Sequence, residues 1–401
     1  MALKTTPPVL GIRALNRATL HRQLLLERAP MGVADAVEHL LGLQAQNTSP
    51  PYYALAARLE GFRPEELSAL METRAVARIV TLRSTVHTHT ARDAVALRGL
   101  AQPGAVDREI AVFVARGGLD GVDLDRLAAL SRSLVEARPR TPKELREELS
   151  RQWPDADPPS LSVAARCLLP LVQVTPRGLW GRSGQVALTT TDHWFGALGG
   201  EAADLRAPGR AASELRAPSG QAPGGQAADL DETVLRYLAA FGPASVKDMQ
   251  SWCGLTRLRT AFERLRPRLL TFRDERGTEL FDLPEAPRPD PDTPAPPRFL
   301  PEFDNLLLSH ADRSRVAAAE HRSRTWTGNR SHRVFLADGF LAGLWHLDET
   351  KERTVLTVEP FAPLGRAALT DVLAEAERTL RIMTPRACLQ RVISTSGVTR
   401  W

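Results

Sequence analysis

The stretch SVKDMQSWCGLTRLRTAFERL, residues 245–265, has the residue pattern of two short helices joined by a turn. Leu258, Phe262 and Leu265 recur at helical spacing and are predicted to face a hydrophobic core. A helix is predicted directly before this stretch and a β-hairpin directly after it. Three helices followed by a hairpin predict a winged-helix module over residues 229–284.

The rest of the chain divides into units of different composition. They are a winged-helix-like N-terminal module at 1–118, a second winged-helix module at 119–198, a low-complexity insertion at 199–228, a Pro-rich linker at 285–297 and a mainly β domain at 298–401. In the first of these, residues 80–87 are predicted as one extended run whose polar side chains share a face. The last should hold a hairpin around Asp338-Gly339 and a closing helix over residues 366–383. The predicted fold class is α+β, with tandem winged-helix modules, each a helix-turn-helix plus a β-wing, and a C-terminal mainly β domain.

Composition excludes several classes of protein. At 401 residues with 43% hydrophobic residues, the chain is long enough for several domains with buried cores. No apolar run approaches the roughly 18 to 20 residues that span a bilayer, and no signal-type apolar segment follows the N-terminus, so we expect a cytoplasmic protein with no membrane partner. Cys167, Cys253 and Cys388 are too far apart for a zinc site or a disulfide framework and are expected to be free thiols.

Positive charge is concentrated late in the chain. The net charge is +5, and residues 310–333 contain six arginines against two acidic residues. The arginines there are Arg313, Arg315, Arg322, Arg324, Arg330 and Arg333. Guanidinium groups bind phosphate, and Trp326 could insert or stack beside Asn329, so this segment is a candidate DNA contact. A loop that only keeps the domain soluble is the alternative, and a GC-rich genome could explain the overall excess of arginine.

A second candidate contact is the polar stripe of Arg257, Thr260 and Arg264 in the third module. In helix-turn-helix units a helix lies against the duplex groove, which would bring such a stripe to DNA. A solvated charged face is the alternative interpretation of the same residues.

Residues 41–51 read LGLQAQNTSPP, in which two neutral amides flank one small residue directly after an apolar helical face. The chain should turn here, because Pro50 biases the residue before it away from helix. In an extended segment residues two apart point the same way, so Gln44 and Gln46 could present two amide groups to one small target.

Four stretches spread over most of the chain carry a resemblance to a known family. They are GLQAQ at 42–46, TLRSTVH at 81–87, LPEFDN at 300–305 and HADRSR at 310–315. Together they resemble the AlkZ/YcaQ family of winged-helix DNA glycosylases, whose catalytic motif is Gln-aliphatic-Gln in the AlkZ branch and Gln-aliphatic-Asp in the YcaQ branch. Glutamine at both positions 44 and 46 matches the AlkZ branch, although Ala45 is smaller than the usual middle residue.

The resemblance implies catalysis by Gln44 and Gln46 and winged-helix modules that line a concave DNA-binding surface. It also suggests, for the AlkZ branch, action on bulky adducts and interstrand crosslinks formed by genotoxic natural products, with limited base flipping. The partner implied is double-stranded DNA carrying alkylated purines, and a nucleoid-associated monomer is expected. The role would be base excision repair or toxin self-resistance.

The chemistry available to glutamine limits the reaction. Glutamine does not take up a proton at ordinary pH, so neither residue can be a general base, and the substrate must already be reactive. A purine alkylated at a ring nitrogen carries positive charge and leaves as a neutral base without protonation. Gln46 is expected to orient the attacking water and Gln44 to assist. No lysine lies near the motif, which argues against a Schiff-base lyase and favours a monofunctional glycosylase.

Other polar residues near these motifs have less defined roles. Arg83 and His87 match the family's stretch and are expected near the site or the DNA. His87 and His89 share a strand face, but no third ligand occurs at helpful spacing, so no metal is predicted, and no cofactor. His310 could help to neutralise phosphate or have a structural hydrogen-bonding role.

Two non-catalytic functions remain open from the sequence. A winged-helix transcription regulator needs only the second and third modules and would treat the glutamines as a polar helix exit. A structural clamp that binds distorted DNA is the other. Release of a free base from alkylated duplex distinguishes the enzyme from both.

Overall fold

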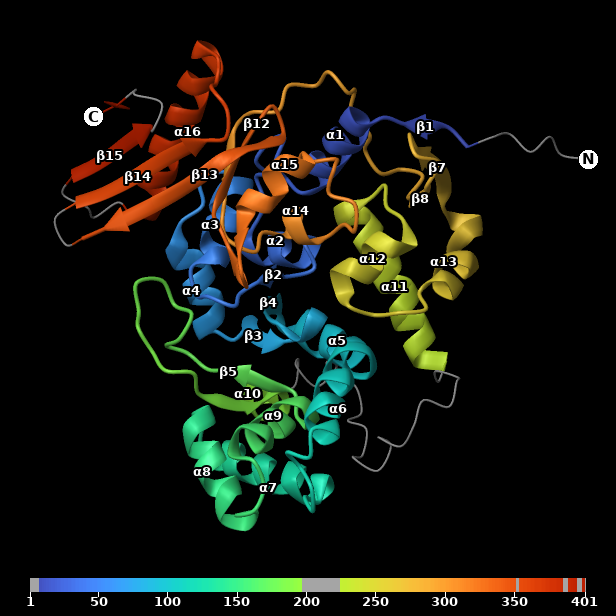
Figure 1. Ribbon diagram of the computed structural model, residues 1–401, viewed down its shortest axis with the longest axis vertical. Coiled ribbons are helices and arrows are strands. Elements are labelled where there is room, and N and C mark those ends of the chain that lie inside the picture. Colours follow the sequence, from blue (N-terminus) through green and yellow to red (C-terminus); the bar gives the residue numbers. More distant parts are fainter. Residues whose placement is uncertain (1–6, 197–223, 351–352, 385–388, 395–398, 401) are drawn as a thin grey trace, which may run out of the picture.

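The computed structural model describes residues 7–196, 224–350, 353–384, 389–394 and 399–400 (Figure 1). Most of the predicted insertion at 199–228 and Cys388 lie outside the described residues. Within the described part of the chain, no helix has the length and apolar character needed to cross a bilayer. Cys167 and Cys253 are buried free thiols, as expected.

The N-terminal module consists of short helices around a small antiparallel ladder. Its elements are α1 (Ile12–Arg22), α2 (Val33–His39), β2 (Leu43–Gln44), α3 (Pro50–Arg58), α4 (Pro64–Glu72), β3 (Val76–Val80), β4 (Val86–Thr90), α5 (Ala91–Ala101) and α6 (Asp107–Ala115). The helix after the glutamines begins at Pro50, because proline tolerates the first turn, where its missing N–H is not needed. Thr90 caps α5 by accepting a hydrogen bond from the backbone N–H of Asp93 at 3.3 Å.

The extended run predicted over residues 80–87 is wrong, because the chain reverses there. A 3₁₀ turn at Leu82–Ser84 separates β3 from β4, and Arg83 and the residue after it have left-handed φ angles of 54° and 55°. Val80 and Val86 pair across this hairpin and therefore share a face. The predicted alternation of apolar and polar residues was correct. The sequence pattern did not show the chain reversal, because both strands keep this alternation.

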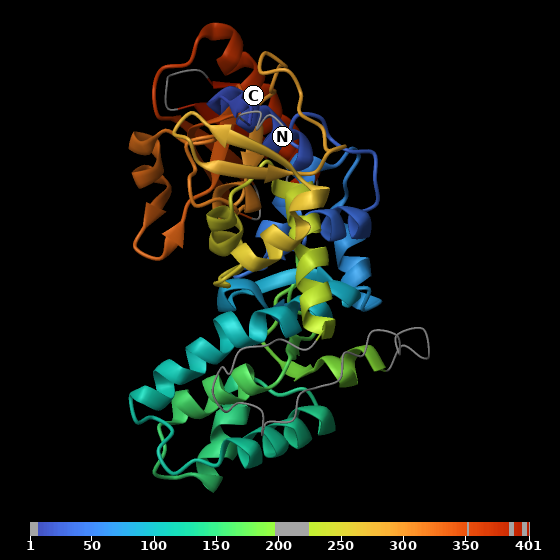
Figure 2. The same cartoon turned by 90° about the vertical axis from the view of Figure 1, so that its right-hand side faces the viewer.

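The second module has the predicted three helices and wing. Its elements are α7 (Leu124–Ala137), α8 (Pro142–Gln152), α9 (Pro158–Leu168), β5 (Leu171–Gln173), β6 (Leu188–Thr190) and α10 (Thr191–Gly196). Thr141 and Glu144 form a reciprocal capping box at the start of α8. Figure 2 shows this module as a lobe below the rest of the molecule.

One sheet joins the first two modules. The strand order is β2-β4-β3-β5-β6, in which β3 pairs antiparallel with β5. The boundary predicted between residues 118 and 119 therefore separates two groups of helices but not the strands, which belong to a continuous sheet. The glutamine strand β2 lies at one edge of that sheet.

The third module confirms the winged-helix pattern. Its elements are α11 (Gly224–Phe241), α12 (Val246–Cys253), α13 (Arg259–Leu265), β7 (Leu270–Asp274) and β8 (Glu279–Asp282), and β1 (Val9–Leu10) adds to β7 in parallel. Leu258, Phe262 and Leu265 are buried as predicted. The wing turns at residues 275–277, with Gly277 at a φ of 81°.

The C-terminal domain contains a six-stranded sheet of order β16-β15-β14-β13-β12-β9 with α16 packed on it. Its elements are β9 (Arg298–Leu300), α14 (Asn305–Leu308), α15 (Ala319–Arg322), β10 (Trp326–Thr327), β11 (Arg330–Ser331), β12 (Val334–Ala337), β13 (Phe340–Glu349), β14 (Arg353–Pro360), α16 (Arg366–Met383), β15 (Leu389–Ser394) and β16 (Thr399–Arg400). The predicted hairpin around Asp338-Gly339 and the predicted helix at 366–383 are both present.

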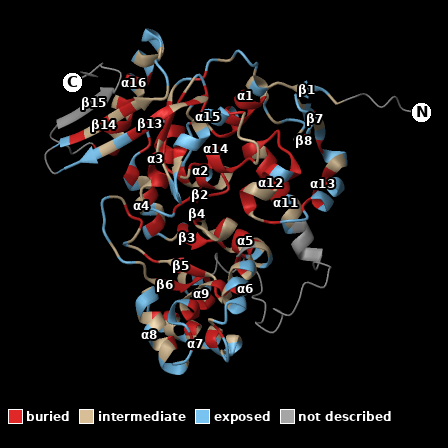
Figure 3. Cartoon of the chain, viewed as in Figure 1, coloured by how far each residue is buried: buried red, intermediate tan, exposed pale blue. Residues whose placement is uncertain are grey.

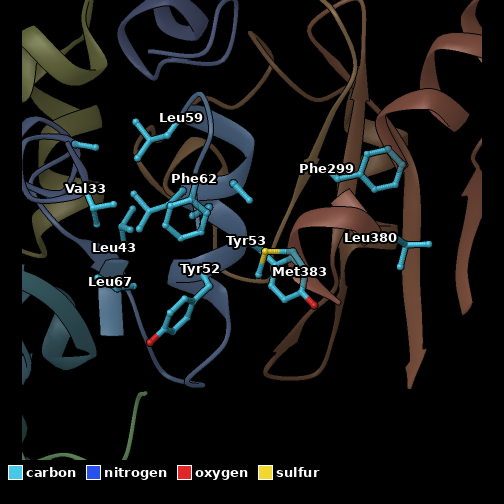
Figure 4. Close-up of a cluster of buried hydrophobic side chains, with 14 of the residues drawn as sticks. Val33, Leu43, Tyr52, Tyr53, Leu59, Phe62, Leu67, Phe299, Leu380 and Met383 are labelled. Atoms are coloured by element: carbon cyan, nitrogen blue, oxygen red, sulfur yellow. The ribbon is translucent and has the colours of Figure 1, made fainter. Parts of the chain in front are cut away.

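The C-terminal domain and the N-terminal module share one hydrophobic core. Burial is continuous across them in Figure 3, and Figure 4 shows side chains of α3 beside those of the C-terminal domain. Tyr53 of α3 packs against Trp345 of β13, with ring centroids 5.4 Å apart. Arg58 of α3 forms a fully buried ion pair with Asp304 at 2.8 Å. These contacts fix the position of the segment that follows the glutamines.

Candidate active site

The two glutamines lie where the edge strand β2 ends. Gln44 pairs with His87 of β4 and is 7% exposed, whereas Gln46, two residues later, is exposed. Ala45 between them is buried in a small apolar cluster with residues of β3 and β4. The alanine side chain therefore anchors the tripeptide to the sheet and leaves the amides on either side of it.

The turn into β2 requires glycine at position 42. Gly42 has a φ of 89°, and a Cβ added there would lie 2.1 Å from Nδ1 of His89. The side chain of Asn305 holds the same turn, because its Nδ2 donates to the carbonyl oxygens of Gly42 at 2.8 Å and Leu40 at 3.3 Å. The start of the glutamine strand is thus set by backbone geometry and by one amide from the C-terminal domain.

Arg83 holds the side chain of Gln44. Its Nη2 donates to Oε1 of Gln44 at 2.6 Å and lies 3.5 Å from Nε2 of His87, and its Nη1 donates to the carbonyl oxygen of Trp252 in α12. Burial lowers the pKa of the Arg83 guanidinium to about 10, so it is charged at neutral pH. The third module is therefore connected to Gln44 through one cation.

Gln46 makes a weaker contact with a neutral group. Its Oε1 accepts a hydrogen bond from the backbone N–H of Val86 at 3.3 Å. Because the residue is exposed, its Nε2 and the second lone pair of Oε1 remain available to a ligand.

A carboxylate from the stretch LPEFDN supports the segment after the glutamines. Oε1 of Glu302 accepts from Nδ2 of Asn47 at 3.2 Å, and its Oε2 accepts from Nε of Arg333 at 2.9 Å. The guanidinium of Arg333 lies 5.1 Å from the Tyr53 ring and 5.0 Å from the Trp345 ring. Asn305 before the motif and Glu302 after it thus hold both ends of the glutamine segment.

The two histidines on β4 are neutral groups of the interior. Their rings stack with centroids 5.5 Å apart, and Oγ1 of Thr81 lies 3.3 Å from Nδ1 of His87 and 2.9 Å from Nε2 of His89. Burial lowers the pKa of His87 well below 6.5 and that of His89 to about 4. Neither can accept a proton near pH 7, and among the described residues they belong to no group of three potential metal ligands.

Three residues predicted to contact DNA are buried, and that expectation is corrected. His87 is 2% exposed and lies opposite Gln44 in the sheet. His310 is 1% exposed with Nε2 at 2.9 Å from the carbonyl oxygen of Phe241, and burial lowers its pKa to about 3. Arg315 is 4% exposed and donates to the carbonyl oxygen of Pro243 at 2.8 Å. His310 and Arg315 connect the C-terminal domain to the third module, and none of the three has a surface to offer to phosphate.

Four other predicted contacts lie on α15 and the β10–β11 hairpin of the C-terminal domain. Arg322 is exposed on α15, and the β10–β11 hairpin exposes Asn329 and Arg330. Trp326 at the base of the hairpin is half-buried, edge-to-face with Phe303 at 5.5 Å. In the described part of the chain, no ion pair involves Arg322 or Arg330.

The remaining predicted contacts have partners or are partly covered. Arg324 stacks on Phe361 at 4.1 Å, and Arg313 is partly buried, which lowers its pKa. Arg264 forms a two-pronged ion pair with Asp231, with Nη2 2.6 Å from Oδ1. Arg257 is exposed in the connection before α13, at a left-handed φ of 61°, so it is not part of the predicted helical stripe.

The chain is similar to known proteins in sequence and in structure. A family model described as DNA glycosylase AlkZ-like matches residues 37–382, which include both glutamines. No curated protein sequence matches significantly. Among solved structures the chain is similar to the DNA glycosylase AlkZ of Streptomyces sahachiroi, with a TM-score of 0.73 and 20% identity over 96% of this chain and 100% of that chain. At this identity the structural likeness establishes the fold alone.

Proposed function

Because this chain belongs to the AlkZ-like DNA glycosylase family, it is a DNA glycosylase, and we propose that it hydrolyses the N-glycosidic bond of cationic N7-alkylpurines in duplex DNA. Bulky natural-product adducts and interstrand crosslinks are the proposed substrates, and base excision repair or toxin self-resistance the proposed role. The proposal rests on the paired amides, Gln44 held by Arg83 and Gln46 open to solvent.

The neutral character of the site matches a leaving group that is already charged. An N7-alkylguanine leaves as a neutral base, so no acid is needed. The enzyme must guide water and stabilise positive charge on the sugar, and the attacking water then loses its proton to bulk solvent. Amide oxygens can guide the water and stabilise the charge, and one preorganised dipole of this kind supplies about 3 kcal/mol. The nearby His87 has its pKa lowered by burial, and Glu302 is engaged by Asn47 and Arg333, so neither is free to act as a base.

The different partners of the two amides suggest a division of labour. Arg83 draws electron density toward Oε1 of Gln44, which strengthens the Nε2–H groups of that amide as donors. Gln46 receives only a long bond from a backbone N–H and keeps an accepting lone pair. A water molecule that accepts from Gln44 and donates to Gln46 would direct its remaining lone pair toward the anomeric carbon. Gln46 is thus the main water-orienting group and Gln44 assists.

The exposed residues of α15 and the β10–β11 hairpin are the proposed DNA contact. Arg322 and Arg330 carry charge without an ion pair in the described part of the chain, and Asn329 adds an amide at the hairpin turn. A half-buried Trp326 behind them could support a wedge against the base stack. Arg257 of the third module is a second proposed phosphate contact.

Substitution of Gln46 tests the catalytic assignment. Gln46→Ala should lower single-turnover release of 7-methylguanine from methylated duplex by about 10² to 10³-fold, because a preorganised group is lost, while affinity for the duplex stays within about twofold. Gln152→Ala, which removes an exposed glutamine from α8, is the matched control and should release base at the wild-type rate. Undiminished release by Gln46→Ala would contradict the assignment.

A panel of duplexes tests the substrate class. Methylated, bulky-adducted and crosslinked DNA are incubated with purified protein, and released bases are identified by mass. Release from N7-alkylpurines but not from uncharged lesions is expected, because the amides offer no acid to assist a neutral leaving group. Release only from uncharged lesions would contradict the proposed substrate class.

A further inference from the structure

The β-ladder beside the glutamines is broken at one hydrogen bond. Ala45 directly follows β2, and continuing the register of β2 and β4 by one residue places it opposite Val86. The N–H of Ala45 donates to the carbonyl oxygen of Val86 at 2.8 Å. In a regular antiparallel pair the N–H of Val86 would return a bond to the carbonyl oxygen of Ala45. It donates instead to Oε1 of Gln46, at 3.3 Å. The side chain of Gln46 thus occupies a position in the ladder that normally belongs to backbone.

The carbonyl oxygen missing from the ladder is bound by an arginine. Nη2 of Arg78 donates to the carbonyl oxygen of Ala45 at 2.8 Å, and its Nη1 donates to that of Asn47 at 3.4 Å. The two carbonyls belong to the residues directly before and after Gln46. One planar guanidinium therefore holds the backbone on both sides of the exposed amide.

The environment of Arg78 is unusual for a cation. It is 2% exposed, and its remaining side-chain partner is the neutral Oε1 of Gln173, at 3.3 Å. In the described ranges no carboxylate lies within ion-pairing distance of it. Burial lowers its pKa to about 10. Gly178 lies against its aliphatic part, because a Cβ at that glycine would be 2.6 Å from Cδ of Arg78.

We propose that Arg78 is a positioning residue for Gln46. It withdraws the carbonyl oxygen of Ala45 from the ladder, so that the amide of Gln46 takes the vacant N–H of Val86 and is held with its free groups toward solvent. This rests on the proposed function, because it assigns the amide that Arg78 positions to the attacking water. Arg78 is buried and therefore acts through the backbone on both sides of Gln46.

The hydrogen bonds around Ala45 predict the effect of removing the Arg78 guanidinium. The carbonyl oxygen of Ala45 becomes free to accept the N–H of Val86, and a backbone acceptor already in register replaces a flexible side chain. The strand then extends past its present end at Gln44, and Oε1 of Gln46 loses its donor. A displacement of about 1 Å at a reacting group is sufficient to lower a rate by about 10²-fold.

A second arginine in the chain provides a matched control. Arg98 of α5 is 4% exposed, and burial lowers its pKa to about 10 as well. Its Nη2 donates to the carbonyl oxygens of Cys167 at 2.9 Å and Leu169 at 3.4 Å, and its Nη1 to the side chain of Gln102. Like Arg78, it holds the carbonyls on both sides of one residue and contacts a glutamine, but these carbonyls lie at the end of α9 in the second module.

The test compares Arg78→Met, Arg78→Lys and Arg98→Met in the full-length protein. Single-turnover release of 7-methylguanine from N7-methylated duplex, affinity for that duplex and the melting temperature are measured for each. Arg78→Met should lower the release rate by about 10²-fold with affinity within about twofold, and Arg78→Lys by about tenfold, because one ammonium cannot hold both carbonyls. Arg98→Met should melt earlier and release base at the wild-type rate.

The outcomes separate this inference from the proposed function. If the wild-type protein releases no base, the proposed function fails and the comparison has no baseline. If the wild-type protein is active and folded Arg78→Lys matches it in rate, the positioning role is wrong. If Arg78→Met does not fold, Arg78→Lys decides alone. A loss of rate in Arg98→Met equal to that in Arg78→Met would also overturn the inference, because it would show a general effect of removing a buried arginine.

Discussion

Arginine has opposite roles in two regions of this glycosylase. At the glutamine strand, the buried Arg78 and the half-buried Arg83 donate to carbonyl and amide oxygens. On α15 and the β10–β11 hairpin of the C-terminal domain, Arg322 and Arg330 are exposed and, in the part of the chain that the structure describes, form no ion pair. The first pair organises backbone and side chain, and the second is available to a polyanion. The same residue type therefore holds neighbouring protein groups in one region and presents unpaired positive charge in the other.

Among the substitutions that test this comparison, removal of the Arg83 guanidinium should have the largest effect on base release and stability. Arg83→Met releases Oε1 of Gln44 and breaks the connection to Trp252, so single-turnover base release should fall by about 10²-fold and the melting temperature should drop by several degrees. The control is Arg63→Met, which removes an exposed arginine beside α4 and should change neither quantity. A fall in duplex affinity with an unchanged release rate would place Arg83 among the DNA contacts instead.

Acid should destabilise the buried region through its histidines. His89 has a pKa of about 4 in the folded protein and an ordinary value of 6.5, so below about pH 6.5 the unfolded chain binds a proton that the native site does not. Its contribution to stability is complete above that pH and is lost as the pH falls toward 4, at roughly 1.4 kcal/mol per pH unit. Urea unfolding of the wild type and His89→Gln across this range measures the difference, and parallel curves for the two proteins would contradict it.

Arg330 should affect binding and not turnover. Arg330→Gln should weaken affinity for any duplex by up to about tenfold and reduce the salt dependence of binding by about one unit of slope, because one phosphate contact is lost. Release from the bound complex should proceed at the wild-type rate. Titration of fluorescent duplex at several salt concentrations measures both, and an unchanged salt slope would exclude a phosphate contact.

The smallest predicted effect separates paired from unpaired exposed arginines. Arg264→Gln should change duplex affinity by less than about twofold, because Asp231 already neutralises that guanidinium, whereas Arg257→Gln should weaken binding by about threefold. The same titration ranks the two variants. A larger loss of affinity in Arg264→Gln than in Arg257→Gln would show that Arg264 leaves Asp231 to bind DNA.

Much of the fold followed from local patterns. The helix at Arg366–Met383 and the hairpin at Asp338-Gly339 were predicted correctly, because periodicity and turn residues act over a few positions. The extended run predicted over residues 80–87 was wrong as an unbroken segment, because Arg83 and Ser84 adopt left-handed φ angles that neither residue type indicates.

The candidate site was partly visible in the chain. Gln44 and Gln46 were identified by a small residue between two amides at a turn, and LPEFDN was noted without a role for Glu302 or Asn305. Arg78 was missed, although a charged residue inside the apolar run VARIV was a signal. Its partners lie 31 to 95 residues away, which no local pattern reports.

Helical periods, caps and turn residues made the winged-helix modules and the amide pair recognisable from the chain itself, because each acts between residues a few positions apart. Which arginines face solvent depended on packing between segments up to hundreds of residues apart. Burial depends on those long-range contacts. Arg315 and Arg330 therefore belong to the same arginine cluster in the sequence, but Arg315 is buried and Arg330 is exposed in the folded protein.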